Sequence, residues 1–166
     1  QRAAGIDDRP VIPDVDEKQI SAEETFDTDI ADPARLHAEI VRLADKAVSR
    51  LRAKNLTGGC VTVKIRRGDF TTYMRQRQVE PRTQETRVVA RIAGELLDGW
   101  RKTQPHAALR LLGVGVSDLG EEVQADLFGA PESTRNRQLD ATVDAVREKF
   151  GSVALRPAST IVKPRE

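Results

Sequence analysis

Aromatic residues, cysteine and histidine are all scarce in this chain of 166 residues, and each shortage excludes something. Aromatic side chains make up only 4% of the sequence, so the core has to be built from Leu, Val, Ile and Ala. The single cysteine, Cys60, excludes an intramolecular disulfide. The two histidines, His37 and His106, lack the Cys/His spacing of a zinc site, and we expect no such site.

Long apolar runs are also missing. No stretch approaches the roughly 20 apolar residues that a membrane-spanning helix needs. The N-terminus has no apolar signal-peptide region and reads like the middle of a longer protein. These absences favour a reducing, cytoplasmic setting and predict no membrane partner.

A catalytic motif is not recognisable either. The Walker-type glycine loop that binds phosphate is absent, and Gly113 and Gly115 fall inside an apolar strand pattern. Glu23 and Glu24 are adjacent, so on a strand their carboxylates point to opposite faces and cannot act as a pair. The Arg-Gly-Asp triplet at residues 67–69 is predicted to be a turn. We therefore assign no catalytic residue to this chain.

The overall composition is that of a soluble globular domain, with 39% hydrophobic and 32% charged residues. The net charge is only +1, but it is unevenly spread. Residues 6–32 contain ten acidic and two basic residues, whereas residues 57–80 contain five basic and two acidic ones. Local basicity of the second kind suits a polyanionic partner.

The first part of the chain predicts a strand and a helix. A short strand signal covers residues 19–26, and Asp32 with Pro33 has the pattern of a helix start. The apolar face of this helix, which is predicted to end near residue 55, consists of Leu36, Ile40, Leu43, Ala47 and Leu51. The glycine pair at 58–59 is then predicted to turn the chain.

A hairpin, a second helix and a last strand follow. Val61, Val63 and Ile65 alternate with polar residues, as in a half-buried strand, and residues 70–79 predict its partner, ended by Pro81. Thr83 is predicted to cap the next helix, and residues 109–117 predict the final strand. The order strand-helix-strand-strand-helix-strand predicts an α+β fold, with both helices on one face of a four-stranded, antiparallel-type mixed sheet.

These signals divide the chain into four parts. Residues 1–17 are predicted to be a linker, 18–119 a domain, 120–137 a tether, and 138–166 a C-terminal helix and tail. The short helix of the last part is predicted to have one apolar face, and either to dock on the domain or to stay mobile. That face consists of Leu139, Val143, Val146 and Phe150.

Basic side chains are concentrated on the predicted hairpin. Lys64 and Arg66 share one face of its first strand, and Arg75 and Arg77 lie two residues apart on its second strand. Together with nearby hydroxyl and amide side chains, notably Thr72, they suit phosphate oxygens. Aromatic residues that could stack on bases are missing, so a grip on a duplex backbone is favoured over sequence reading. The alternative is a charged sheet face that only meets solvent.

Four stretches of the sequence resemble the little finger domain of Y-family DNA polymerases, specifically the DNA polymerase IV branch. They are Ile20–Phe26 with its Glu-x-Thr-Phe signature, Gly59–Thr72 with its Asp-Phe-Thr-Thr ending, Met74–Gln78 and Leu111–Ser117. The four stretches occur in the family's order and with matching spacing, from about residue 6 to residue 119.

The resemblance implies a function and the residues that perform it. In this family the little finger domain holds the primer–template duplex through backbone contacts, and the full protein copies damaged DNA during repair. The implied DNA-binding residues here are Ser21, Lys64, Arg66, Thr72, Arg75 and Arg77. The family's Mg²⁺ ions are held by carboxylates of the palm domain, so the resemblance implies no cofactor in this chain and a nucleoid-associated, cytoplasmic protein.

Residues 124–128, Gln-Ala-Asp-Leu-Phe, resemble the short peptide by which bacterial polymerases bind the β sliding clamp. Leu127 and Phe128 would fill an apolar pocket, while Gln124 and Asp126 supply polar contacts and the tether supplies reach. The alternative is an apolar pair that packs on the domain itself or on the 139–150 helix.

Two further hypotheses remain open at this point. The chain could come from a noncatalytic accessory relative that lacks the palm carboxylates. It could also be a stand-alone nucleic-acid or protein adaptor of α+β fold. The sequence that precedes residue 1 in the natural protein distinguishes both from a polymerase.

Overall fold

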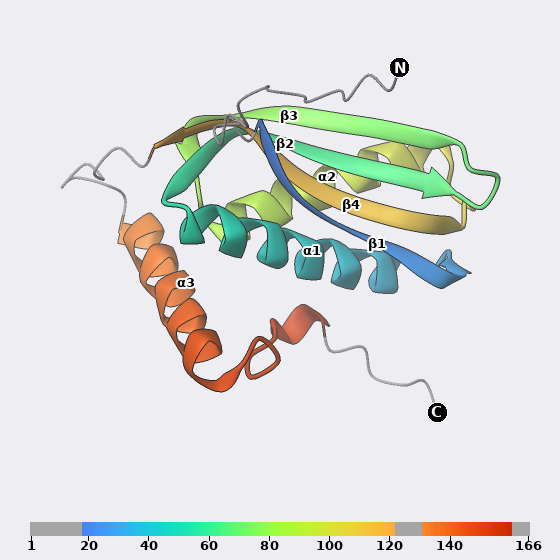
Figure 1. The fold of residues 1–166 in the computed structure, drawn as a ribbon. Coiled ribbons are helices and arrows are strands. Elements are labelled where there is room, and N and C mark those ends of the chain that lie inside the picture. The colour runs from blue at the N-terminus through green and yellow to red at the C-terminus, as the bar shows by residue number, and fades with distance from the viewer. Residues whose placement is uncertain (1–17, 122–130, 161–166) are drawn as a thin grey trace, which may run out of the picture.

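The computed structural model describes residues 18–121 and 131–160 (Figure 1). Its main body follows the predicted order of strand, helix, strand, strand, helix and strand, and a third helix and a 3-10 turn come after it. The bounds are β1 (Gln19–Ile30), α1 (Pro33–Ala53), β2 (Leu56–Arg67), β3 (Thr72–Thr83), α2 (Thr86–Thr103), β4 (Leu109–Glu121), α3 (Pro131–Phe150) and η1 (Ala158–Thr160).

The strands form one sheet in the order β1-β4-β2-β3. Each neighbouring pair is antiparallel, so the sheet is antiparallel throughout these four strands rather than mixed. Both α1 and α2 lie on the same side of the sheet, α1 towards β1 and α2 towards β3 (Figure 1). The predicted α+β fold is thereby confirmed, and the opposite face of the sheet, called the open face below, is left without a helix from the described ranges.

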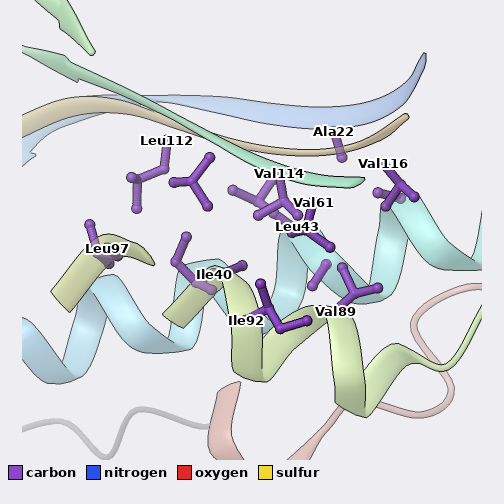
Figure 2. Close-up of a cluster of buried hydrophobic side chains, with 14 of the residues drawn as sticks. Ala22, Ile40, Leu43, Val61, Val89, Ile92, Leu97, Leu112, Val114 and Val116 are labelled. Atoms are coloured by element: carbon purple, nitrogen blue, oxygen red, sulfur yellow. The ribbon is translucent and has the colours of Figure 1, made fainter. Parts of the chain in front are cut away.

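The core lies between the sheet and the two helices. Val61, Val63 and Ile65 of β2 are buried there, as are Leu112 and Val116 of β4, because alternate strand residues point to the same face. Figure 2 shows the helix side chains Ile40, Leu43, Val89, Ile92 and Leu97 beneath these strands. Burial of each such side chain contributes about 1.5–3 kcal/mol, which is what holds the two layers together.

At Gly58, the backbone of β2 lies so close to β4 that no side chain would fit between them. A Cβ atom on Gly58 would lie 2.0 Å from Cγ1 of Val116, whose side chain is fully buried, and 3.3 Å from the carbonyl oxygen of Ser117. The prediction that the glycine pair turns the chain is wrong: β2 already begins at Leu56, and the turn is made by Asn55 with a φ of 54°. Gly58 instead provides the space that β4 needs.

Pro81 does not end its strand, contrary to the prediction, and β3 continues to Thr83. Proline lacks an N–H group, but an edge strand such as β3 needs hydrogen bonds on one side only and therefore tolerates it. Thr83 does not cap the next helix either. Its hydroxyl accepts a hydrogen bond from the N–H of Glu85 at 3.0 Å, and α2 begins only at Thr86.

The C-terminal helix α3 is longer than predicted. It begins at Pro131, within the stretch predicted to be a tether, because Pro is well suited to the first turn of a helix. Its apolar residues do not form a buried face: Leu139 and Phe150 are 61% and 68% exposed.

Within the described residues, no helix is long and apolar enough to cross a membrane.

Polar contacts hold α3 against the end of the helix layer instead. Arg52 of α1 reaches two carboxylates of α3, with its Nε 2.7 Å from Asp144 and its Nη1 3.3 Å from Asp140. Arg147 pairs with Asp45 of α1 at 2.7 Å, and both side chains are only 14% exposed. Burial raises the pKa of Asp140, although a hydrogen bond from the N–H of Thr86 and the charge of Arg52 oppose that shift. The docked face of α3 is therefore polar.

Replacing Arg52 by alanine is expected to release α3 while the sheet and its two helices stay folded. The change leaves Asp140 and Asp144 without their cation in a half-buried setting, which costs about 1–3 kcal/mol. Since both carboxylates can return to water if α3 leaves, the loss cannot exceed the docking free energy of the helix. Hydrogen exchange should show faster exchange in α3 and, outside it, only in the first turn of α2, because Arg52 also donates to the carbonyl of Gln84 and the hydroxyl of Thr86. Arg50→Ala removes an exposed neighbouring arginine and should leave α3 protected; equal exchange in both variants would contradict the assignment.

Candidate nucleic-acid interface

The open face carries two of the predicted cations on β2. Lys64 and Arg66 alternate with the buried Val63 and Ile65, so they point away from the helices. The Nζ of Lys64 lies 3.0 Å from a carboxylate oxygen of Glu23, on β1. The Nε of Arg66 donates to the hydroxyl of Thr72 at 2.9 Å. The surface offers cations and hydroxyl groups, but one of its cations is already paired.

Two glycines make the middle of the open face shallow. Gly113 and Gly115 of β4 have no side chain, and a hollow of about 260 Å³ lies over them. The side-chain amide of Gln19 lies across the space that a Cβ on Gly115 would occupy, at 2.3 Å. Ser21, predicted as a phosphate contact, lines this hollow together with Glu23 and Lys64, as does Met74 from β3. Ser21, Lys64, Arg66 and Thr72 thus belong to one surface.

The register of β2 and β3 places the other two predicted cations elsewhere. Arg75 pairs with Val63 and Arg77 pairs with Val61, both of which face the helices. Side chains directly opposite in an antiparallel pair share one face, so Arg75 and Arg77 lie on the helix side of the sheet. The sequence grouped them with Lys64 and Arg66, and the structure separates them. Because β3 is an edge strand, both arginines remain exposed.

Beside β3, Arg77 contacts the exposed face of α2. Arg77 forms an ion pair with Glu95, and Arg91, one helical turn away, approaches the other oxygen of Glu95 at 3.3 Å. The hydrogen bond from Arg77, with the charges of both arginines, lowers the pKa of Glu95 despite some desolvation. Arg75 donates to the backbone carbonyl of Met74. Sequence reasoning missed Arg91 and Glu95, since only the β3 register brings them beside Arg77.

The connection between β2 and β3 forms a third feature. Phe70 has a φ of 66° and is 67% exposed, and the guanidinium of Arg110 lies 5.2 Å from its ring centroid. Arg110 also pairs with Asp29 of β1 at 3.0 Å. A hydrogen bond from the N–H of Thr71 lowers the pKa of Asp69. The predicted turn at 67–69 is confirmed, and Arg110 is an additional cation that no sequence pattern indicated.

Other chemistry is not assembled in the ranges 18–121 and 131–160. They contain no group of three or more His, Cys, Asp or Glu side chains that could hold a metal ion. His37 bonds to Asp98 on the surface at 2.8 Å, and Cys60 is buried. The predicted clamp-binding residues Gln124, Asp126, Leu127 and Phe128 lie outside the described residues.

Comparisons with known proteins identify relatives of this chain. The family described as the impB/mucB/samB family C-terminal domain matches residues 17–127. A protein of Streptomyces coelicolor named DNA polymerase IV is 42% identical over 133 residues, which are 80% of this chain and 27% of that protein. One of Dehalococcoides mccartyi with the same name is 36% identical over 159 residues, 95% of this chain and 40% of that protein. The chain therefore spans less than half the length of these relatives.

Solved structures share the fold of the main body. The insertion ternary complex of Dbh DNA polymerase aligns with a TM-score of 0.57 and 12% identity, covering 63% of this chain and 29% of that one. A Y-family DNA polymerase chimera aligns with a TM-score of 0.54 and 15% identity over the same shares. At these identities the likeness concerns the fold alone.

Proposed function

The chain belongs to the impB/mucB/samB family C-terminal domain, and from this membership we propose that it holds duplex DNA without reading its sequence. It would do so as the little finger domain of a translesion polymerase of the DNA polymerase IV type. The resemblance seen in the sequence is confirmed by the family match and by relatives of that name. The observation that carries the DNA-binding proposal is the exposed arginine pair of β3, Arg75 and Arg77, inside the matched region.

Phosphate contacts explain these surfaces better than base stacking does. On the open face, Lys64 and Arg66 have the hydroxyls of Ser21 and Thr72 near them, and on the helix side Arg75 and Arg77 are exposed. All four cations can pair with phosphate oxygens and release counterions. Tyr73 is not free to stack on bases, because its ring packs against Trp100 with the centroids 5.3 Å apart. A backbone grip of this kind positions a duplex and carries little sequence preference.

Nucleotide addition belongs to the proposed whole protein rather than to the residues described here. The relatives are polymerases in name and more than twice as long as the matched part. We propose that the parent adds nucleotides opposite damaged template with Mg²⁺ held by carboxylates of another domain. The described carboxylates do not fit that ion, since they gather into no group that could hold a metal. This chain's share is to keep the duplex in place.

Replacing Arg75 and Arg77 together by alanine should weaken duplex binding equally for unrelated DNA sequences. Each lost phosphate contact lowers the slope of log affinity against log salt by about 0.9, so the slope should fall by about 1 to 2. Fluorescence anisotropy of labelled duplexes between low and moderate salt measures this. The control replaces Arg35 and Lys46, two exposed cations of α1, and should leave the slope unchanged. A double variant with the slope of the wild type would refute the proposed DNA grip.

We further propose that residues 124–128 bind a β sliding clamp, as the sequence resemblance implies. They follow the end of β4 at Glu121 and precede the start of α3 at Pro131. A clamp peptide placed directly after a DNA-holding domain would keep the polymerase near its substrate between binding events. The support is the motif and its position in the chain.

A further inference from the structure

The ion pairs at the β3–α2 edge have the arrangement of an occupied anion site. We infer that a phosphate group of duplex DNA takes the place of the Glu95 carboxylate between Arg77 and Arg91, and that Arg75 extends this site along β3. The inference rests on the proposed DNA binding and deepens it: it adds a binding residue on α2, Arg91, and an internal competitor, Glu95.

One carboxylate holds both guanidinium groups. Oε2 of Glu95 contacts Nη1 of Arg77, and Oε1 lies 3.3 Å from Nη1 of Arg91. Two arginines from different elements therefore converge on an anion that offers two oxygens. A phosphodiester group also offers two non-bridging oxygens, and arginine pairs with carboxylates and phosphates through the same planar donors.

The exchange of one anion for the other is inexpensive because the site is open to water. The side chains of Arg77, Glu95 and Arg91 are 46%, 44% and 63% exposed. Ion pairs this exposed contribute little to stability, so the Glu95 side chain can move away without leaving a buried charge. While the Glu95 carboxylate stays between the two arginines, its negative charge repels an approaching phosphate and so lowers the affinity for DNA.

Arg75 is a further cation beside this site, and none of the described ion pairs joins it to a carboxylate. It lies two residues from Arg77 on the same face of β3, and the hydrogen bond recorded for its Nη1 goes to the Met74 carbonyl. The edge thus has two arginines, Arg77 and Arg91, in contact with Glu95, and a third, Arg75, beside Arg77 on the same face of β3. On the open face, by contrast, Lys64 faces Glu23 as a single pair.

The test uses the whole 166-residue chain and a short labelled duplex of random sequence. Glu95→Gln removes the competing charge but keeps the size of the side chain, and should raise duplex affinity about three- to tenfold at low salt. Arg91→Ala should lower affinity and reduce the salt slope by about 0.9. In the variant with both changes the gain from Glu95→Gln should shrink, because one of the two freed arginines is missing.

Two matched variants supply the controls. Glu23→Gln removes a carboxylate from the pair with Lys64 on the open face, and Arg35→Ala removes an exposed arginine of α1. Glu23→Gln should raise affinity less than Glu95→Gln, and Arg35→Ala should leave the salt slope unchanged.

The outcomes separate this inference from the function it rests on. Equal gains from Glu95→Gln and Glu23→Gln would show that only net charge matters, and would overturn the site. If the unaltered chain binds duplex with a steep salt slope and Arg91→Ala changes neither affinity nor slope, the site is also overturned, while the DNA-binding proposal stands. If the unaltered chain binds no duplex, the proposed function fails and the site fails with it.

Discussion

Replacing Leu127 and Phe128 together by alanine is expected to lower the affinity of the chain for a bacterial β sliding clamp by at least about 100-fold. Burial of each such side chain is worth about 1.5–3 kcal/mol, and a loss of about 1.4 kcal/mol reduces affinity tenfold. Two lost anchors thus remove most of the binding free energy of a short peptide. Isothermal titration calorimetry with purified clamp measures the effect. The affinity of the same variant for duplex DNA should not change.

The matched control for this variant lies on α3. Leu139 and Phe150 are an exposed leucine and an exposed phenylalanine elsewhere in the chain, and their replacement by alanine should leave clamp affinity unaltered. If the α3 variant instead loses clamp binding and the Leu127/Phe128 variant keeps it, the clamp contact belongs to α3. The peptide assignment would then be wrong.

Gly58→Ala is expected to destabilise the domain by about 1–3 kcal/mol, as overpacking of a tight site does. The added methyl carbon would meet the buried Val116 at 2.0 Å, and the nearby carbonyl oxygen of Ser117 blocks a simple shift of β2. Val116 is fully buried, so its side chain cannot turn aside without disturbing the core. Urea unfolding followed by circular dichroism gives the free energy of unfolding.

Gly99→Ala provides the opposite expectation from the same chemical change. Gly99 lies within α2, and nothing comes within 4 Å of a Cβ placed there. Alanine favours the helix over glycine by about 0.5–1 kcal/mol, so this variant should be more stable than the parent. Equal stability of the two variants would show that the contact between β2 and β4 is looser than the distances indicate.

Much of the fold follows from local pattern, whereas the site depends on long-range register. The alternation of Val61, Val63 and Ile65 identifies the core face of β2 without any knowledge of its neighbours. For β3 the same reasoning shows only that Arg75 and Arg77 share a face. Which face that is depends on how the two strands pair, and a shift of one residue reverses it. The sequence contains no signal that sets this register unambiguously.

The docking of α3 shows a second limit of pattern reading. An apolar stripe usually identifies the buried face of a helix, but in α3 Leu139 and Phe150 of that stripe are exposed. The helix instead docks through charged side chains, and for Asp144 and Arg147 the partners, Arg52 and Asp45, lie 92 and 102 positions earlier in the chain. Periodicity describes one element at a time and cannot reveal a complementary charge on a distant one.

The unlike edges of the sheet have a kinetic consequence. The charged residues of β1 are acidic (Glu23, Glu24, Asp27 and Asp29), and those of β3 are three arginines and one glutamate (Arg75, Arg77, Arg82 and Glu80). With strands about 4.8 Å apart, these opposite charges stand roughly 14 Å from each other and give the domain an electric dipole across its sheet. The electric field of a polyanion would rotate the domain so that its β3 edge faces the polyanion before any contact forms. Productive encounters would then be a larger fraction of all collisions.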